Sequence, residues 1–114
     1  MGLFLGLFRK RGYATITGSQ LQKMMSSNNI LILDVRSSGE YKGGHIPNAR
    51  NIPVDTLSSK LSTLNSYKDS EIVVYCVSGG RSARACDILS KNGFTKVYNL
   101  SGGISSYKGR LTEN

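Results

Sequence analysis

Two continuous apolar runs constrain the fold of this 114-residue chain more than any other feature. They occupy residues 30–35 and 71–75, and neither alternates apolar with polar side chains as a half-exposed strand does. Both are therefore expected to be strands covered on both faces, as in parallel sheets. Helical patterns separate the strand patterns, which predicts a parallel α/β sheet. Ligands bind at the carboxyl ends of such strands, where Asp34 and Cys76 lie.

The shorter elements follow the same alternation of strand and helix signals. Ahead of the first apolar run we expect a strand at 14–17 and a helix capped by Ser19. Glycine and proline indicate an irregular stretch at 37–54, after which Asp55 is expected to cap a helix. The last elements are expected to be a helix from 82 to 90 with a stop at 92–93, a strand at 96–99 and a glycine-opened turn at 102–103.

The loop after the second run places a cysteine where a strand gives way to a helix. It consists of Cys76, Val77, Ser78, Gly79, Gly80 and Arg81. The glycines let the backbone curl without Cβ clashes, and the first amides of the following helix have no partner within it. Such amides stabilise an anion, so we expect them to lower the pKa of the Cys76 thiol. The loop therefore predicts a reactive thiolate in a cradle of backbone amides.

Two residues of this loop have side chains that suit either function or structure. Arg81 is expected either to bind an anionic substrate or to brace the loop by pairing with a carboxylate such as Asp34. Ser78 is suited to donate a hydrogen bond to the sulfur or its cargo, and equally to a tight turn.

Four residues upstream of the loop are further candidates. We expect Asp34 to have a structural role rather than a catalytic one, because a buried carboxylate needs a partner. Arg36 is expected either to guard the mouth of the pocket or to lie solvated on the surface. His45, the only histidine, is expected to fix a turn by hydrogen bonding rather than to act as a general base. Glu40 is assigned local capping or pairing and no catalytic role.

Cysteine count and charge narrow the class of protein further. Two cysteines are too few for a disulfide framework, which favours a reducing compartment and a cytoplasmic location. Cys86 is expected to be a small buried hydrophobe rather than a residue that resolves a disulfide with Cys76. The net charge is +8, but no basic helix or aromatic platform accompanies it, so nucleic-acid binding is not expected.

The first 12 residues read as an extension, followed by one domain at 13–114. Seven apolar residues followed by basic ones are too few to span a bilayer and stand in the wrong order for a secretory signal. The interpretation we favour is a loosely packed tail. Its alternative is a weak interfacial anchor that would place the protein at the inner face of a membrane.

The motifs together resemble the rhodanese family of sulfurtransferases in its single-domain form. The resemblance runs from about residue 13 to residue 107. Its motifs, in family order, are 34–36 with 40–41 (DVR, EY), 44–53 (GHIPNARNIP), 76–83 (CVSGGRSA), 93–94 (GF) and 102–104 (GGI). Tyr107 departs from the pattern, since many members carry tryptophan there.

The resemblance implies a central five-stranded parallel sheet with helices on both faces. It also implies that the Cys76 thiolate takes sulfane sulfur from a small anionic donor such as thiosulfate, and passes it from a persulfide to cyanide or a thiol. No metal or organic cofactor is implied, and a monomer is expected. The backbone amides of residues 77–81, with Arg81 and Arg36, are the expected substrate-binding groups, and Asp34 is expected to support the loop.

Two alternatives remain open beside this sulfurtransferase. Cysteine phosphatases and arsenate reductases on the same scaffold place five residues between cysteine and arginine, whereas this loop has four, which favours a single sulfur atom over a tetrahedral oxyanion. The second alternative is a module that relays sulfur within a larger pathway without free turnover. Since Arg81 is the only charge in the loop, a strong preference for a dianionic donor does not follow.

Overall fold

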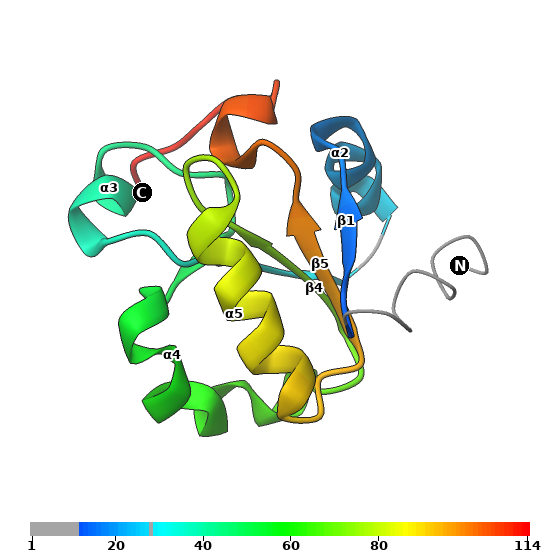
Figure 1. Ribbon diagram of the computed structural model, residues 1–114. Coiled ribbons are helices and arrows are strands. Elements are labelled where there is room, and N and C mark those ends of the chain that lie inside the picture. The colour runs from blue at the N-terminus through cyan, green and yellow to red at the C-terminus, as the bar shows by residue number, and fades with distance from the viewer. Residues whose placement is uncertain (1–11, 28) are drawn as a thin grey trace.

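Five parallel strands form one sheet in the computed structural model, which describes residues 12–27 and 29–114 (Figure 1). The strand order is β1-β5-β4-β2-β3. The strands are β1 (Ala14–Ile16), β2 (Leu31–Asp34), β3 (Arg50–Asn51), β4 (Glu71–Tyr75) and β5 (Lys96–Leu100). The two apolar runs form β2 and β4, which pair with Asp34 opposite Tyr75. The expected five-stranded parallel sheet is thus confirmed, with the carboxyl ends of β2 and β4 side by side.

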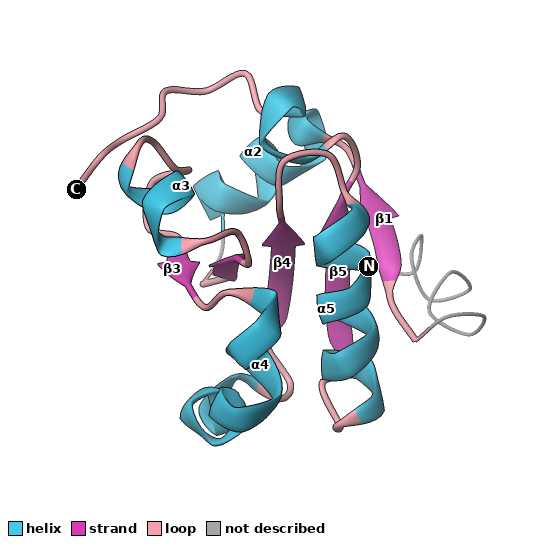
Figure 2. Cartoon of the chain, turned by 60° about the vertical axis from the view of Figure 1, so that its left-hand side comes forward, coloured by secondary structure: helices cyan, strands magenta, loops and turns pink. Residues whose placement is uncertain are grey.

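Helices cover both faces of this sheet, as expected. One face carries α4 (Val54–Lys60), the 3-10 helix η1 (Leu61–Tyr67) and α5 (Gly80–Lys91), and Figure 2 shows α4 and α5 together in front of the strands. The other face is covered by α2 (Gly18–Ser27). The short helix α3 (Ser38–Lys42) and the 3-10 helix η2 (Gly103–Ser106) lie beyond the carboxyl ends of the strands.

Two cores explain why the apolar runs do not alternate. Leu33 of β2 packs in one core with Leu89 of α5, whereas its neighbour Ile32 packs in the other core with Leu21 of α2. Each strand thus buries both of its faces. Cys76, directly after β4, belongs to the core that lies beneath α5.

Two predicted caps are wrong. Thr17, not Ser19, caps α2: its hydroxyl accepts the Gln20 amide at 3.1 Å while the Gln20 side chain accepts the Thr17 amide at 2.8 Å. This reciprocal pair satisfies two amide donors at once, which Ser19 inside the helix does not do. Asp55 lies in the first turn of α4, which begins at Val54 after Pro53.

The stretch at 37–54 was expected to be irregular, but it contains α3 and β3. Both are too short to give a periodic pattern: α3 has five residues and β3 has two. A capping box stabilises α3, in which the Ser37 hydroxyl accepts the Glu40 amide and the Glu40 carboxylate accepts the Ser37 amide.

The predicted extension lies almost wholly outside the described residues, since the description begins at Gly12. Its interpretation as tail or anchor therefore stays a prediction. Within the described part of the chain, no helix has the length and apolar character needed to cross a membrane.

Candidate active site

Cys76 lies at the carboxyl end of β4 with its sulfur turned into the loop that leads to α5. Its side chain is buried, with 2% exposure. The amides of Gly79 and Ser82 donate to Sγ at 3.1 and 3.4 Å. The expected amide cradle is therefore present, built from the loop and the first turn of α5.

The hydroxyl beside the sulfur belongs to Ser82, whereas Ser78 is exposed. Ser82 Oγ lies 3.4 Å from Sγ and donates to Asn99 Oδ1 of β5 at 2.6 Å. Both side chains are buried, and our reading of the sequence missed them. A serine in the first turn of the helix after the cysteine was an available signal for Ser82; nothing near Asn99 indicated a site.

The two cysteines have opposite ionisation properties. Burial raises the pKa of the Cys76 thiol, but hydrogen bonds from the Ser82 hydroxyl and from the Ser82 and Gly79 amides outweigh burial, and the pKa is lowered. Burial raises the pKa of Cys86, which is fully enclosed, and the nearby Cys76 raises it further. Cys86 is the buried hydrophobe that was expected, and Cys76 is the group suited to be a thiolate.

The shape of the loop depends on two glycines in backbone conformations that other residues rarely adopt. Gly79 has φ +122° and ends the loop just before α5. Gly103 has φ +62°, and a Cβ there would collide with the carbonyl of Val77. The next residue, Ile104, donates its amide to the carbonyl of Cys76 at 2.9 Å. The turn at 102–103 thus packs against the backbone of the cysteine loop and fixes its position.

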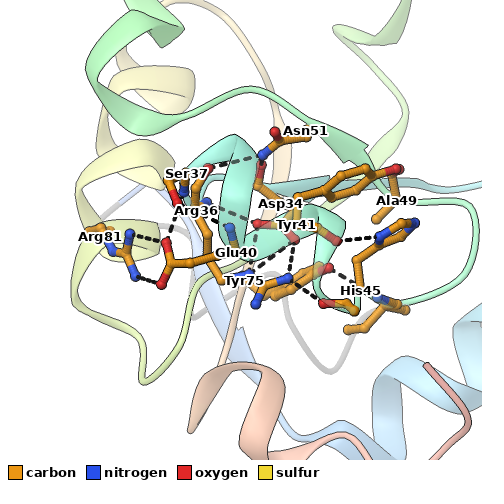
Figure 3. Close-up of polar contacts among 12 residues, drawn as sticks. Asp34, Arg36, Ser37, Glu40, Tyr41, His45, Ala49, Asn51, Tyr75 and Arg81 are labelled. Atoms are coloured by element: carbon orange, nitrogen blue, oxygen red, sulfur yellow. Dashed lines mark hydrogen bonds and ion pairs between the residues drawn. The ribbon is translucent and has the colours of Figure 1, made fainter. Parts of the chain in front are cut away.

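Arg81 pairs with the carboxylate of Glu40, and not with Asp34, which was the example given for a bracing partner. Figure 3 shows the guanidinium and carboxylate joined by two bonds, with Nη1 to Oε1 at 2.8 Å and Nη2 to Oε2 at 3.1 Å. Asp34 is not available because Arg36, two residues away, already binds both of its oxygens. Of the two expected roles of Arg81, bracing the loop agrees with this contact, and the partner is on α3.

Both expectations for Arg36 are wrong, since it neither guards the mouth nor lies solvated. Its side chain is buried, with Nη2 donating to Asp34 Oδ2 at 2.7 Å and to the Gly44 carbonyl at 2.8 Å (Figure 3). The Asp34 backbone carbonyl accepts the Ile52 amide at 3.0 Å. The ion pair with Arg36 and the hydrogen bond with Ile52 together fix the segments that follow β2. Asp34 therefore supports the site by holding the surrounding backbone in place, and not by direct contact with Arg81.

His45 fixes a turn, as expected. Its Nδ1 lies 2.7 Å from the Tyr41 carbonyl, its ring stacks on the Tyr41 ring with centroids 3.6 Å apart, and its backbone pairs with Thr112. A histidine held in this way organises the segment between α3 and β3.

Among residues 12–27 and 29–114, no group of three or more His, Cys, Asp or Glu side chains is arranged to hold a metal ion. At the carboxyl end of β4 the described groups supply a buried cysteine whose thiol pKa is lowered, two backbone amides that donate to its sulfur, a serine hydroxyl 3.4 Å from the sulfur and one ion-paired arginine.

Comparison with known proteins agrees with this arrangement. The family model described as "Rhodanese-like domain" matches residues 17–110. The uncharacterized protein YqhL of Bacillus subtilis is 40% identical over 80 residues, which cover 70% of this chain and 62% of that protein. The tRNA uridine(34) hydroxylase of Cronobacter sakazakii is 33% identical over 102 residues, and the match spans only 29% of its length.

Solved structures give the same result. A rhodanese-related protein from Thermoplasma volcanium superposes with a TM-score of 0.80 at 30% identity, covering 90% of this chain and 100% of that one. The human single-domain sulfurtransferase TSTD1 superposes with a TM-score of 0.72 at 28% identity, covering 82% and 93% of the two chains.

Proposed function

This chain belongs to the rhodanese-like domain family, and from that membership and the geometry of its loop we propose that it is a sulfurtransferase with Cys76 as nucleophile. The observation that carries the proposal is the set of polar groups at Sγ: two amides that donate to it at 3.1 and 3.4 Å, and the Ser82 hydroxyl, which lies 3.4 Å away and can turn its proton to a thiolate. These donors stabilise negative charge on the sulfur and on a sulfur atom attached to it.

The proposed reaction has two displacement steps. The thiolate attacks the sulfane sulfur of thiosulfate; the Sγ–S bond forms as the donor S–S bond breaks, and sulfite leaves with the electron pair. A thiophilic acceptor, cyanide or a thiol, then attacks the outer sulfur of the persulfide, and the electron pair returns to Cys76 as its thiolate. Neither step needs a proton from a histidine, which agrees with the structural role of His45.

The length of the loop supports sulfur transfer over phosphoryl transfer. Four residues separate Cys76 from Arg81, and Arg81 is turned to Glu40. A phosphatase or arsenate reductase needs amides and a guanidinium arranged around a tetrahedral oxyanion. Here two of the amides already bind the sulfur.

Turnover assays separate the candidate functions. With thiosulfate and cyanide we expect thiocyanate from the wild type and from Cys86→Ala, the matched control for loss of a cysteine, but none from Cys76→Ser. Hydrolysis of an aryl phosphate without thiocyanate formation would contradict sulfur transfer. Sulfur passed to a thiol but not to cyanide would indicate a relay module rather than an enzyme with free turnover.

A further inference from the structure

The one cation of the cysteine loop is neutralised by a carboxylate from another element. Arg81, at the start of α5, binds Glu40 of α3 through two nearly parallel hydrogen bonds. Both side chains are about two fifths exposed, so the pair lies where solutes reach it. A fork-to-fork contact of this kind fixes the direction of the guanidinium more firmly than a single bond does.

Glu40 is held in this position independently of Arg81. Its Oε1 also accepts the Ser37 amide at 2.9 Å, and its own amide donates to the Ser37 hydroxyl, so the capping box anchors the residue. The hydrogen bond from Arg81, followed by that from the Ser37 amide, lowers the pKa of Glu40 to about 2. The carboxylate therefore stays charged throughout the pH range in which a thiolate reacts.

The charges around the sulfur consequently do not favour a dianion. The Cys76 thiolate and Glu40 are negative and Arg81 is positive, which leaves one net negative charge. Arg36 does not change this balance, because it is buried against Asp34. Two amides that could bind an incoming anion already donate to Sγ. A thiosulfate dianion would therefore approach a site of its own sign.

We propose that Glu40 sets the charge selectivity of Cys76: by neutralising Arg81, it disfavours dianionic electrophiles and favours donors whose sulfane sulfur is bound to the sulfur atom of an organic thiol and not to a dianionic sulfonate group. This inference rests on the proposed function where it concerns the donor. The donor class it names is the persulfide of a thiol. The Sγ–S bond forms as the donor S–S bond breaks, the electron pair leaves with the donor thiolate, and the donor proton stays on the transferred sulfur.

Alkylation tests the charge effect without requiring sulfur transfer. Iodoacetamide is neutral and iodoacetate is an anion, and both react with the thiolate by displacing iodide. In Glu40→Gln we expect the ratio of the iodoacetate rate to the iodoacetamide rate to rise about fivefold at low salt, and the rise to shrink at high salt. Glutamine preserves the capping box, so α3 should keep its fold.

The control is Asp87→Asn, which removes the same charge from an exposed pair with Lys91 farther along α5. This variant should leave the ratio unchanged, and Arg81→Gln should lower it. An unchanged ratio in Glu40→Gln, or an equal rise in Asp87→Asn, would overturn the proposal.

Sulfur donors complete the test. We expect Glu40→Gln to raise the rate of loading from thiosulfate more than fivefold while the rate from cysteine persulfide changes less than twofold. Equal changes with both donors would contradict the role of Glu40 in donor selection. A shifted alkylation ratio with no loading from either donor would uphold the effect of Glu40 on Cys76 and overturn the proposed sulfur transfer instead.

Discussion

Replacing Ser82 with alanine should raise the pKa of the Cys76 thiol by about one unit. The hydroxyl lies 3.4 Å from Sγ but also donates to Asn99 Oδ1 at 2.6 Å, so its single proton must leave Asn99 to serve the thiolate. A hydrogen bond to a charged group contributes about 1.5–3 kcal/mol, and giving up the Asn99 bond costs about 1 kcal/mol. The difference, on the order of 1 kcal/mol, corresponds to about one pKa unit. The amides of Gly79 and Ser82 remain and keep part of the stabilisation.

The pH dependence of alkylation by iodoacetamide measures this shift, with peptide mapping to distinguish Cys76 from Cys86. The rate should increase with pH through the pKa of Cys76, and the midpoint should lie higher in Ser82→Ala. Ser78→Ala is the matched control, since it removes an exposed hydroxyl from the same loop and should leave the midpoint unchanged. Ser82→Thr, which retains a hydroxyl, should keep the midpoint close to that of the wild type. A midpoint in Ser82→Ala equal to that of the wild type would refute the reasoning.

Four further variants test the residues that surround the site. Asp34→Asn should lower the free energy of unfolding by about 3–5 kcal/mol in a denaturant titration, because it leaves the buried Arg36 without its counter-charge; a loss below about 1 kcal/mol would contradict this. Gly103→Ala should destabilise the protein by at least about 2 kcal/mol, since φ is +62° and a Cβ would enter the cysteine loop; an unchanged thermal midpoint would refute the packing. His45→Gln should lower stability yet leave the pH profile of alkylation unmoved, and a shifted profile would indicate a role in ionisation. The ion pair of Glu40 with Arg81 stabilises the folded state at pH values above the ordinary carboxyl pKa of 4.5, and this stabilisation is lost as the pH falls through about 2. The thermal unfolding midpoint of Glu40→Gln should therefore fall less between pH 5 and pH 2 than that of the wild type, and an equal fall in both proteins would contradict the lowered pKa.

The sheet was predictable from sequence because its central strands bury both faces. Ile32 and Leu33 point into different cores, so the chain must be apolar at both positions, and that requirement is visible without coordinates. The cap of α2 was not predictable in the same way. Thr17 and Ser19 are both suitable capping residues, and the choice depends on the side chain of Gln20, which reaches back to the Thr17 amide.

The candidate site, too, could be predicted only in part from the sequence. The position of Cys76 follows from local order along the chain, strand then glycine loop then helix. Partners from distant segments do not: Arg81 pairs with Glu40, whereas Asp34, the carboxylate named from the sequence, is already bound to Arg36. The pairing of β4 with β5 brings Asn99 to the site, and no sequence pattern near residue 99 predicts that position.

The most direct test of the central claim is the intact mass of the protein after incubation with thiosulfate or cysteine persulfide. The account predicts a gain of one sulfur atom that maps to Cys76, is removed by cyanide or a reducing thiol, and is absent from Cys76→Ser. A wild-type protein that gains no sulfur from either donor, or a Cys76→Ser variant that gains the same mass, would contradict it.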